Sequence, residues 1–89
     1  MNIILVYPRW NYPTFGQLQE PLGLLHIGAM LKAHGDTAKF FDLAVDAIER
    51  LDEALADADL VCISSSTVLF GRACLVLDRI KKKCPSLPV

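Results

Sequence analysis

Two groups of side chains in this 89-residue sequence could do chemistry. The first combines a cation, an amide and three large aromatic rings: Arg9, Trp10, Asn11, Tyr12 and Phe15. The second is an uninterrupted run of hydroxyl side chains: Ser64, Ser65, Ser66 and Thr67. Hydroxyls and backbone N–H groups at the start of a helix can bind an anion or an amide. The same hydroxyls can instead cap the helix, and the rings can instead pack against a neighbouring domain, so both interpretations stay open.

Several familiar sites fail on residue type. A dinucleotide-binding turn needs G-x-G-x-x-G after the first strand, where this sequence has only Gly16. No G-x-x-x-x-G-K-[ST] phosphate loop occurs, and a phosphoacceptor site would need acidic residues where Tyr7, Pro8 and Ser64 stand. Because no nucleophile, base and orienting group can be combined, we predict no catalytic residue in this chain.

The remaining titratable candidates stand singly. His26 falls inside an apolar helical segment with no partner at metal-ligand spacing, so we expect a partly buried packing residue and no metal site. His34 falls in the last turn of that helix, where a cation is favourable. Asp42 ends the second predicted strand and could either face a ligand hydroxyl or close a turn.

The elements that must position these groups alternate along the chain. Near-continuous apolar runs predict strands at residues 2–7, 37–43 and 60–64, the third of them central and buried on both faces. Residues 87–89 have the character of the first steps of a fourth strand. Strands that alternate with helices predict an α/β fold with a parallel sheet and right-handed crossovers. Ligands of such sheets bind outside the carboxyl ends of the strands, which are followed here by residues 8–20, 42–46 and 64–67.

Three helices connect these strands. The first has Pro21 in its first turn and Gly35 as a left-handed cap, and the second begins at a capping box of Asp46 and Glu49. The third ends in three lysines that complement its dipole. The residues expected to face the sheet are Leu24, Ile27, Gly28 and Leu31 in the first helix, Ile48, Leu51 and Leu55 in the second, and Leu69, Ala73, Val76 and Ile80 in the third.

Composition limits the class of protein. The chain is 53% hydrophobic with a mean hydropathy of +0.36, which suggests faces meant to be covered by something outside this chain. A net charge of -1 provides no basic surface, so we predict no nucleic-acid partner. No apolar stretch approaches the ~20 residues of a membrane span. Without a secretory signal, we expect a cytoplasmic protein whose three cysteines, Cys62, Cys74 and Cys84, pack as small hydrophobes.

The order of the motifs resembles a known family. The sequence runs through NIILVYP, EPLGLLHIGAMLKAHG, KFFDL, DADLVCISSST and a helix ending in KKKCPSLPV. This set resembles the N-terminal cobalamin-binding domain of class B radical SAM proteins, which include methyltransferases and anaerobic magnesium-protoporphyrin IX monomethyl ester cyclases. Pro21, Gly23, Leu24, Leu31 and Gly35 take the places of the family's P-x-G-L-x-x-L-A-x-x-L-x-x-x-G helix motif.

The resemblance implies a flavodoxin-like (Rossmann-like) doubly wound parallel sheet, truncated here to about three βα units. Residues 1–89 would be one domain, the N-terminal part of a cobalamin-binding-like domain, with its remainder and a radical SAM domain expected beyond Val89. The chain itself would not be catalytic. Its corrinoid, bound without a lower His ligand, would act as a methyl carrier or redox partner, while S-adenosylmethionine and a 4Fe-4S cluster would belong to the downstream domain.

The resemblance also assigns cofactor-binding residues. The hydroxyl run would line the nucleotide tail of the corrinoid, and the loop after the first strand would lie near the lower face of the corrin, with Trp10 the first candidate beneath cobalt. The residues assigned to the cofactor are Pro8, Arg9, Trp10, Asn11, Tyr12, Gly23, Asp42, Ser64, Ser65, Ser66 and Thr67.

A second function stays open beside the first. The aromatic loop and the surplus of hydrophobic residues fit a cofactor-free docking or dimerisation module of the same α/β fold equally well. Its partners would be the downstream radical SAM domain or a second copy of the chain, joined through the exposed sheet edge beside the third strand.

Overall fold

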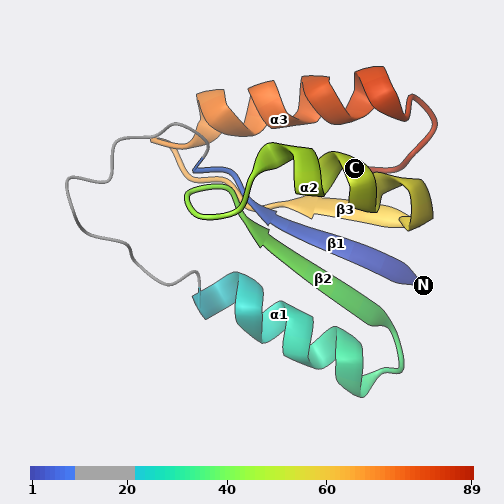
Figure 1. Cartoon of the computed structure of the whole chain (residues 1–89). Coiled ribbons are helices and arrows are strands. Elements are labelled where there is room, and N and C mark those ends of the chain that lie inside the picture. Colours follow the sequence, from blue (N-terminus) through green and yellow to red (C-terminus); the bar gives the residue numbers. More distant parts are fainter. Residues whose placement is uncertain (10–21) are drawn as a thin grey trace.

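The three strands form one parallel sheet in the order β2-β1-β3. The computed structural model describes residues 1–9 and 22–89. Its elements are β1 (Asn2–Tyr7), α1 (Leu22–Ala33), β2 (Thr37–Asp42), α2 (Ile48–Ala54) with a 3₁₀ turn (Leu55–Asp57), β3 (Leu60–Ile63) and α3 (Phe70–Lys83) (Figure 1). The predicted α/β class and parallel sheet are therefore confirmed, as a small Rossmann-like unit.

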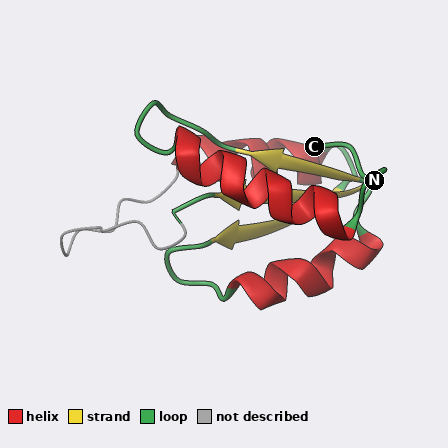
Figure 2. Cartoon of the chain, turned by 90° about the horizontal axis from the view of Figure 1, so that it is seen from above, coloured by secondary structure: helices red, strands yellow, loops and turns green. Residues whose placement is uncertain are grey.

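Register brings the carboxyl ends of the strands to one edge of the sheet. Tyr7 pairs with Asp42 of β2, and Val6 pairs with Ile63 of β3. All three strands point the same way, as Figure 2 shows. The segments that follow β1, β2 and β3 therefore start from the same edge, which is the edge where ligands of parallel sheets bind.

The outer strand β3 differs from its prediction. Among the described residues it lies at one edge of the sheet, whereas β1 is central, so the expectation of a central third strand is wrong. The chain returns past β1 on its way from β2 to β3, so no strand among residues 1–9 and 22–89 pairs with the far side of β3. The backbone N–H of Val61 donates to the carbonyl of Pro88 over 3.0 Å, so the residues expected to start a fourth strand do lie beside β3.

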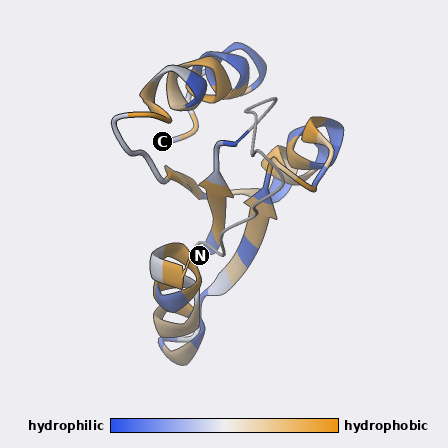
Figure 3. Cartoon of the chain, turned by 90° about the vertical axis from the view of Figure 1, so that its left-hand side faces the viewer, coloured by the Kyte–Doolittle hydropathy of each residue, from blue (hydrophilic) through white to orange (hydrophobic). Residues whose placement is uncertain are grey.

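Helices cover both faces of the sheet, α1 on one and α2 with α3 on the other (Figures 1 and 3). The core on the α2–α3 face contains Ile4, Val6, Phe41, Leu43, Ile48, Leu51, Leu55, Val61, Val76 and Ile80. On the α1 face, the buried residues that the structure describes are Ile3, Leu5 and Leu24. The apolar positions predicted for α2 and α3 are all buried, which confirms those two stripes.

The prediction for α1 is correct only in part. Leu24 is buried and Leu31 packs against the α1-face core, but Ile27 is 49% exposed and His26 is exposed. Because α1 is apolar on nearly every side, helical spacing alone did not identify the face that meets the sheet. Gly28 does lie on that face, since a Cβ there would stand 3.2 Å from Cδ1 of Leu5.

Of the two helix caps predicted from the sequence, the structure confirms one and contradicts the other. Gly35 has a φ of 91°, which confirms the predicted left-handed cap of α1. The predicted capping box of α2 is wrong, because Ala47 occupies the N-cap position and makes no side-chain cap hydrogen bond. Asp46 instead accepts a hydrogen bond from the backbone N–H of Asp42. None of the helices in the described residues is long and apolar enough to cross a membrane.

Candidate functional site

The predicted site residues that end or follow a strand lie at the carboxyl edge of the sheet. Pro8 and Arg9 follow β1, Asp42 ends β2, and Ser64 follows β3. Gly23 lies exposed in the first turn of α1, where a Cβ would meet no atom within 4 Å, so packing does not require glycine there. The predicted residues Trp10, Asn11, Tyr12 and Phe15 lie outside the described residues.

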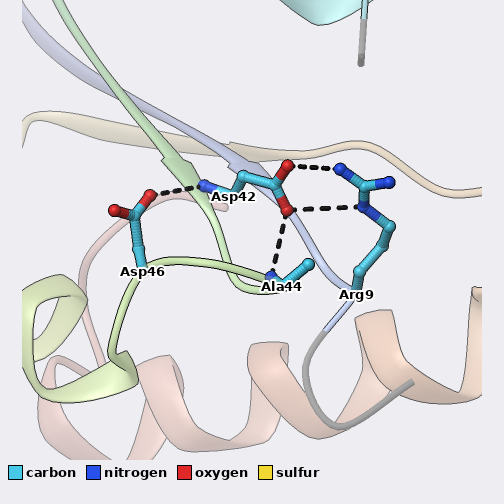
Figure 4. A network of polar contacts seen from close by, with 4 residues as sticks. All are labelled: Arg9, Asp42, Ala44 and Asp46. Atoms are coloured by element: carbon cyan, nitrogen blue, oxygen red, sulfur yellow. Dashed lines mark hydrogen bonds and ion pairs between the residues drawn. The ribbon is translucent and has the colours of Figure 1, made fainter. Parts of the chain in front are cut away.

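Arg9 and Asp42 form a buried ion pair at this edge (Figure 4). Arg9 Nε donates to Asp42 Oδ1 over 3.4 Å, and Arg9 Nη2 donates to Asp42 Oδ2. The guanidinium carbon also lies 4.5 Å from the centre of the Tyr7 ring. Arg9 is only 7% exposed and Asp42 8%. Because a buried charge is unfavourable without a partner, each of the two side chains needs the other to be charged at this depth.

Asp42 also organises the turn that follows β2. Its Oδ1 accepts the backbone N–H of Ala44 over 3.0 Å, and its own backbone N–H donates to Asp46 Oδ2 over 2.9 Å. The backbone N–H of Leu43 continues the ladder to the carbonyl of Tyr7. Of the two roles predicted for Asp42, the structure therefore shows the turn role, and it adds a pairing with Arg9 that the sequence reasoning missed.

The hydroxyl run extends from the end of β3 toward α3. The backbone N–H of Ser64 donates to the carbonyl of Val6 over 3.0 Å, which fixes the first hydroxyl beside β1. Ser65, Ser66 and Thr67 are exposed. The N-cap position of α3 is Leu69, with no side-chain cap hydrogen bond, so the run stands before the cap and does not supply it. The alternative interpretation of these residues as helix caps is therefore wrong.

An apolar groove of about 230 Å³ adjoins the hydroxyl run. It lies between β3 and α3, and residues that line it include Ile63, Ser65, Phe70, Cys74 and Leu77. Phe70 is 63% exposed at the rim of this groove. Ser65 belongs to both features, so a hydroxyl-rich surface and an apolar surface meet at one point of the carboxyl edge.

The cysteines and histidines do not form a metal site. In the part of the chain that the structure describes, no group of three His, Cys, Asp or Glu side chains could hold a metal ion. Cys62 and Cys84 pack against the two cores as expected, but Cys74 is exposed, contrary to prediction. It lies on the side of α3 that lines the groove, next to the sheet-facing positions that Ala73 and Val76 take.

A second ion pair joins α2 to α3. Arg79 Nη2 lies 2.6 Å from Asp52 Oδ2, and Arg79 Nε donates to Asp52 Oδ1 over 3.0 Å. Hydrogen bonding from Arg79, with its charge and that of Lys83, lowers the pKa of Asp52, although partial burial opposes this shift. This pair offers a comparison for the Arg9–Asp42 pair, since it uses the same two residue types away from the carboxyl edge.

Comparisons with known proteins were made at three levels. No family model, no curated protein and no solved structure matches this chain.

Proposed function

We propose that this chain is the N-terminal part of a flavodoxin-like cobalamin-binding domain from a radical SAM protein. The connection after β1 runs to β2 on one side of it, and the connection after β2 crosses back to β3 on the other side, so the strand order reverses at β1. A ligand site is therefore expected outside the carboxyl ends of β1 and β3. The observation that carries the proposal is the meeting of the hydroxyl run and the apolar groove at this point, with the hydroxyls left free of helix capping.

The chemistry of this surface fits the nucleotide tail of a corrinoid. Such a tail combines a flat apolar base with a polar sugar and phosphate, and the groove with Ser65 at its margin offers both kinds of surface. Ser66 and Thr67 would add exposed hydroxyls beside the tail. When bound, the corrinoid would supply a methyl carrier or redox centre to a downstream radical SAM domain with its S-adenosylmethionine and 4Fe-4S cluster. The role of this chain would be to bind and orient it.

Titration of the protein with hydroxocobalamin, followed by visible absorbance and gel filtration, tests the proposal. We expect a spectral change and corrinoid that stays with the protein. Replacing Ser65 and Ser66 together by alanine should weaken binding about tenfold, in line with ~0.5–1.5 kcal/mol per lost hydrogen bond. Ser86→Ala is the matched control, because Ser86 lines a separate hollow formed with Ala58 and Asp59. No spectral change and no retained corrinoid would contradict the proposal.

A cofactor-free docking or dimerisation module is the second candidate function. It is favoured by the apolar side chains that α1 leaves exposed, among them Leu22, Leu25, Ile27 and Met30. Size-exclusion chromatography with light scattering separates the two functions. A stable dimer that retains no corrinoid would support the module, whereas a corrinoid-binding protein whose oligomeric state is unchanged by Met30→Lys would contradict it.

A further inference from the structure

The Arg9–Asp42 pair ties together the carboxyl ends of β1 and β2. Arg9 comes two residues after the β1 residue that pairs with Asp42 in the register. The backbone N–H of Arg9 donates to the carbonyl of Tyr7, and the backbone N–H of Leu43 donates to that same carbonyl. Backbone and side-chain contacts therefore fix where the chain leaves both β1 and β2.

The carboxylate of Asp42 has little capacity left for a ligand. A carboxylate offers about four acceptor sites, and three donors already occupy it: Arg9 Nε, Arg9 Nη2 and the backbone N–H of Ala44. Its 8% exposure limits access further. A ligand hydroxyl could bind here only by displacing Arg9, which would leave a buried charge without its partner.

We infer that Arg9 and Asp42 are positioning residues, which fix the β1–β2 half of the carboxyl edge and leave ligand contact to the β1–β3 half. The inference rests on the proposed function for the ligand, but the geometry that it assigns to Arg9 and Asp42 does not depend on which ligand binds. It replaces the cofactor-contacting role that the sequence resemblance gave to both residues. It predicts that removing one charge of the pair disturbs the conformation of the chain where it leaves β1 and β2. Removing both charges together should restore that conformation.

A double-mutant cycle separates positioning from ligand contact. Arg9→Met leaves a buried carboxylate, and Asp42→Asn leaves a buried guanidinium, so each should destabilise the edge. The double variant leaves neither charge unpaired, and its asparagine can still accept the N–H of Ala44. We expect each single variant to bind hydroxocobalamin at least tenfold more weakly, and the double variant to bind within about threefold of the original chain.

Trp10 provides a readout that needs no corrinoid. It is the single tryptophan of the sequence and follows Arg9 directly, so its fluorescence reports on the chain next to the pair. We expect altered emission and quenching in both single variants and recovery in the double variant. Arg9→Lys keeps the charge but loses the forked geometry, so it should change Trp10 emission less than Arg9→Met does. It takes the place of Arg9→Met if that variant fails to fold. Asp52→Asn is the matched control, because it breaks the α2–α3 pair and should leave Trp10 emission unchanged.

The outcomes are distinct. Single variants that keep the original Trp10 emission would overturn the positioning role. A folded double variant with recovered emission would also overturn it if that variant bound corrinoid as weakly as the single variants. Such a result would indicate that Arg9 or Asp42 contacts the ligand. If the original chain binds no hydroxocobalamin, the proposed function fails, while recovery of Trp10 emission across the cycle would still support positioning by Arg9 and Asp42.

Discussion

Among the described residues, the core beneath α2 and α3 contains ten buried residues, whereas the core beneath α1 on the opposite face of the sheet contains three. The same central strand serves both faces, since Ile4 and Val6 point to the larger core and Ile3 and Leu5 to the smaller one. The strand is therefore equally apolar on each side, and the difference comes from the helices. α2 and α3 close the first face, and α1 lies on the second (Figure 3).

The helices themselves differ in the same sense. α3 is amphipathic, with Ala73, Val76 and Ile80 buried along one stripe and charged residues at its end. α1 is apolar on nearly every side yet leaves Met30 60% exposed. A helix that is hydrophobic all round is typical of one covered by neighbours on more than one side. The comparison teaches that most of the buried core of the described residues lies on the α2–α3 face, whereas α1 leaves large apolar side chains exposed.

Truncating the larger core should have the largest effect of any change proposed here. Ile80 is fully buried, so Ile80→Ala should lower the free energy of unfolding by about 2–5 kcal/mol through lost burial and a new cavity. Met30→Ala on α1 should change it by less than ~0.5 kcal/mol. Urea unfolding followed by far-UV circular dichroism measures both. Equal losses from the two variants would mean that α1 is covered in solution, which would break the comparison.

The contrast between α3 and α1 also explains which parts of the fold the sequence predicted. The stripe of α3 was predicted correctly because its polar and apolar positions differ clearly, whereas α1 offered several equivalent faces and Ile27 was placed inward in error. The alternation of strands and helices predicted a parallel sheet, but it did not predict the strand order that puts β3 at the edge.

The site was predicted less completely than the fold. Asp42 was identified from its place at the end of a strand, but its pairing with Arg9 was not, because 33 positions separate them. Only the register that sets Tyr7 beside Asp42 brings the two together, and register depends on tertiary packing that a local pattern does not contain. The hydroxyl run was located correctly, while the groove beside it arises from residues on separate elements.

The ion pair between α2 and α3 should give the better-covered face a distinct pH dependence. The pKa of Asp52 is lowered in the folded chain, chiefly by its hydrogen bond from Arg79. Its contribution to stability is therefore present above the unfolded pKa of about 3.9 and is lost as the pH falls through the lower folded value. We expect Asp52→Asn to be less stable than the original chain at pH 7, with the difference in free energy of unfolding narrowing below about pH 4.

Urea unfolding across pH 2.5–7, a range that brackets the carboxyl pKa, measures this difference. Glu53→Gln, a neutralisation at an exposed neighbour, is the control, and a difference that stays constant with pH would contradict the assignment.

Two glycines of α1 test the weaker face with the smallest expected effects. Alanine favours a helix over glycine by up to about 1 kcal/mol, and a Cβ at Gly23 meets no atom within 4 Å, so Gly23→Ala should stabilise the chain by up to that amount. At Gly28 a Cβ would stand 3.2 Å from the Leu5 side chain, so Leu5 must move and the gain in helix propensity should be largely offset. The difference between the two variants in urea unfolding therefore measures how tightly α1 is held against β1. If Gly28→Ala stabilised the chain as much as Gly23→Ala, the α1 face would be looser than its contact with Leu5 indicates, and the contrast between the two faces would be sharper still.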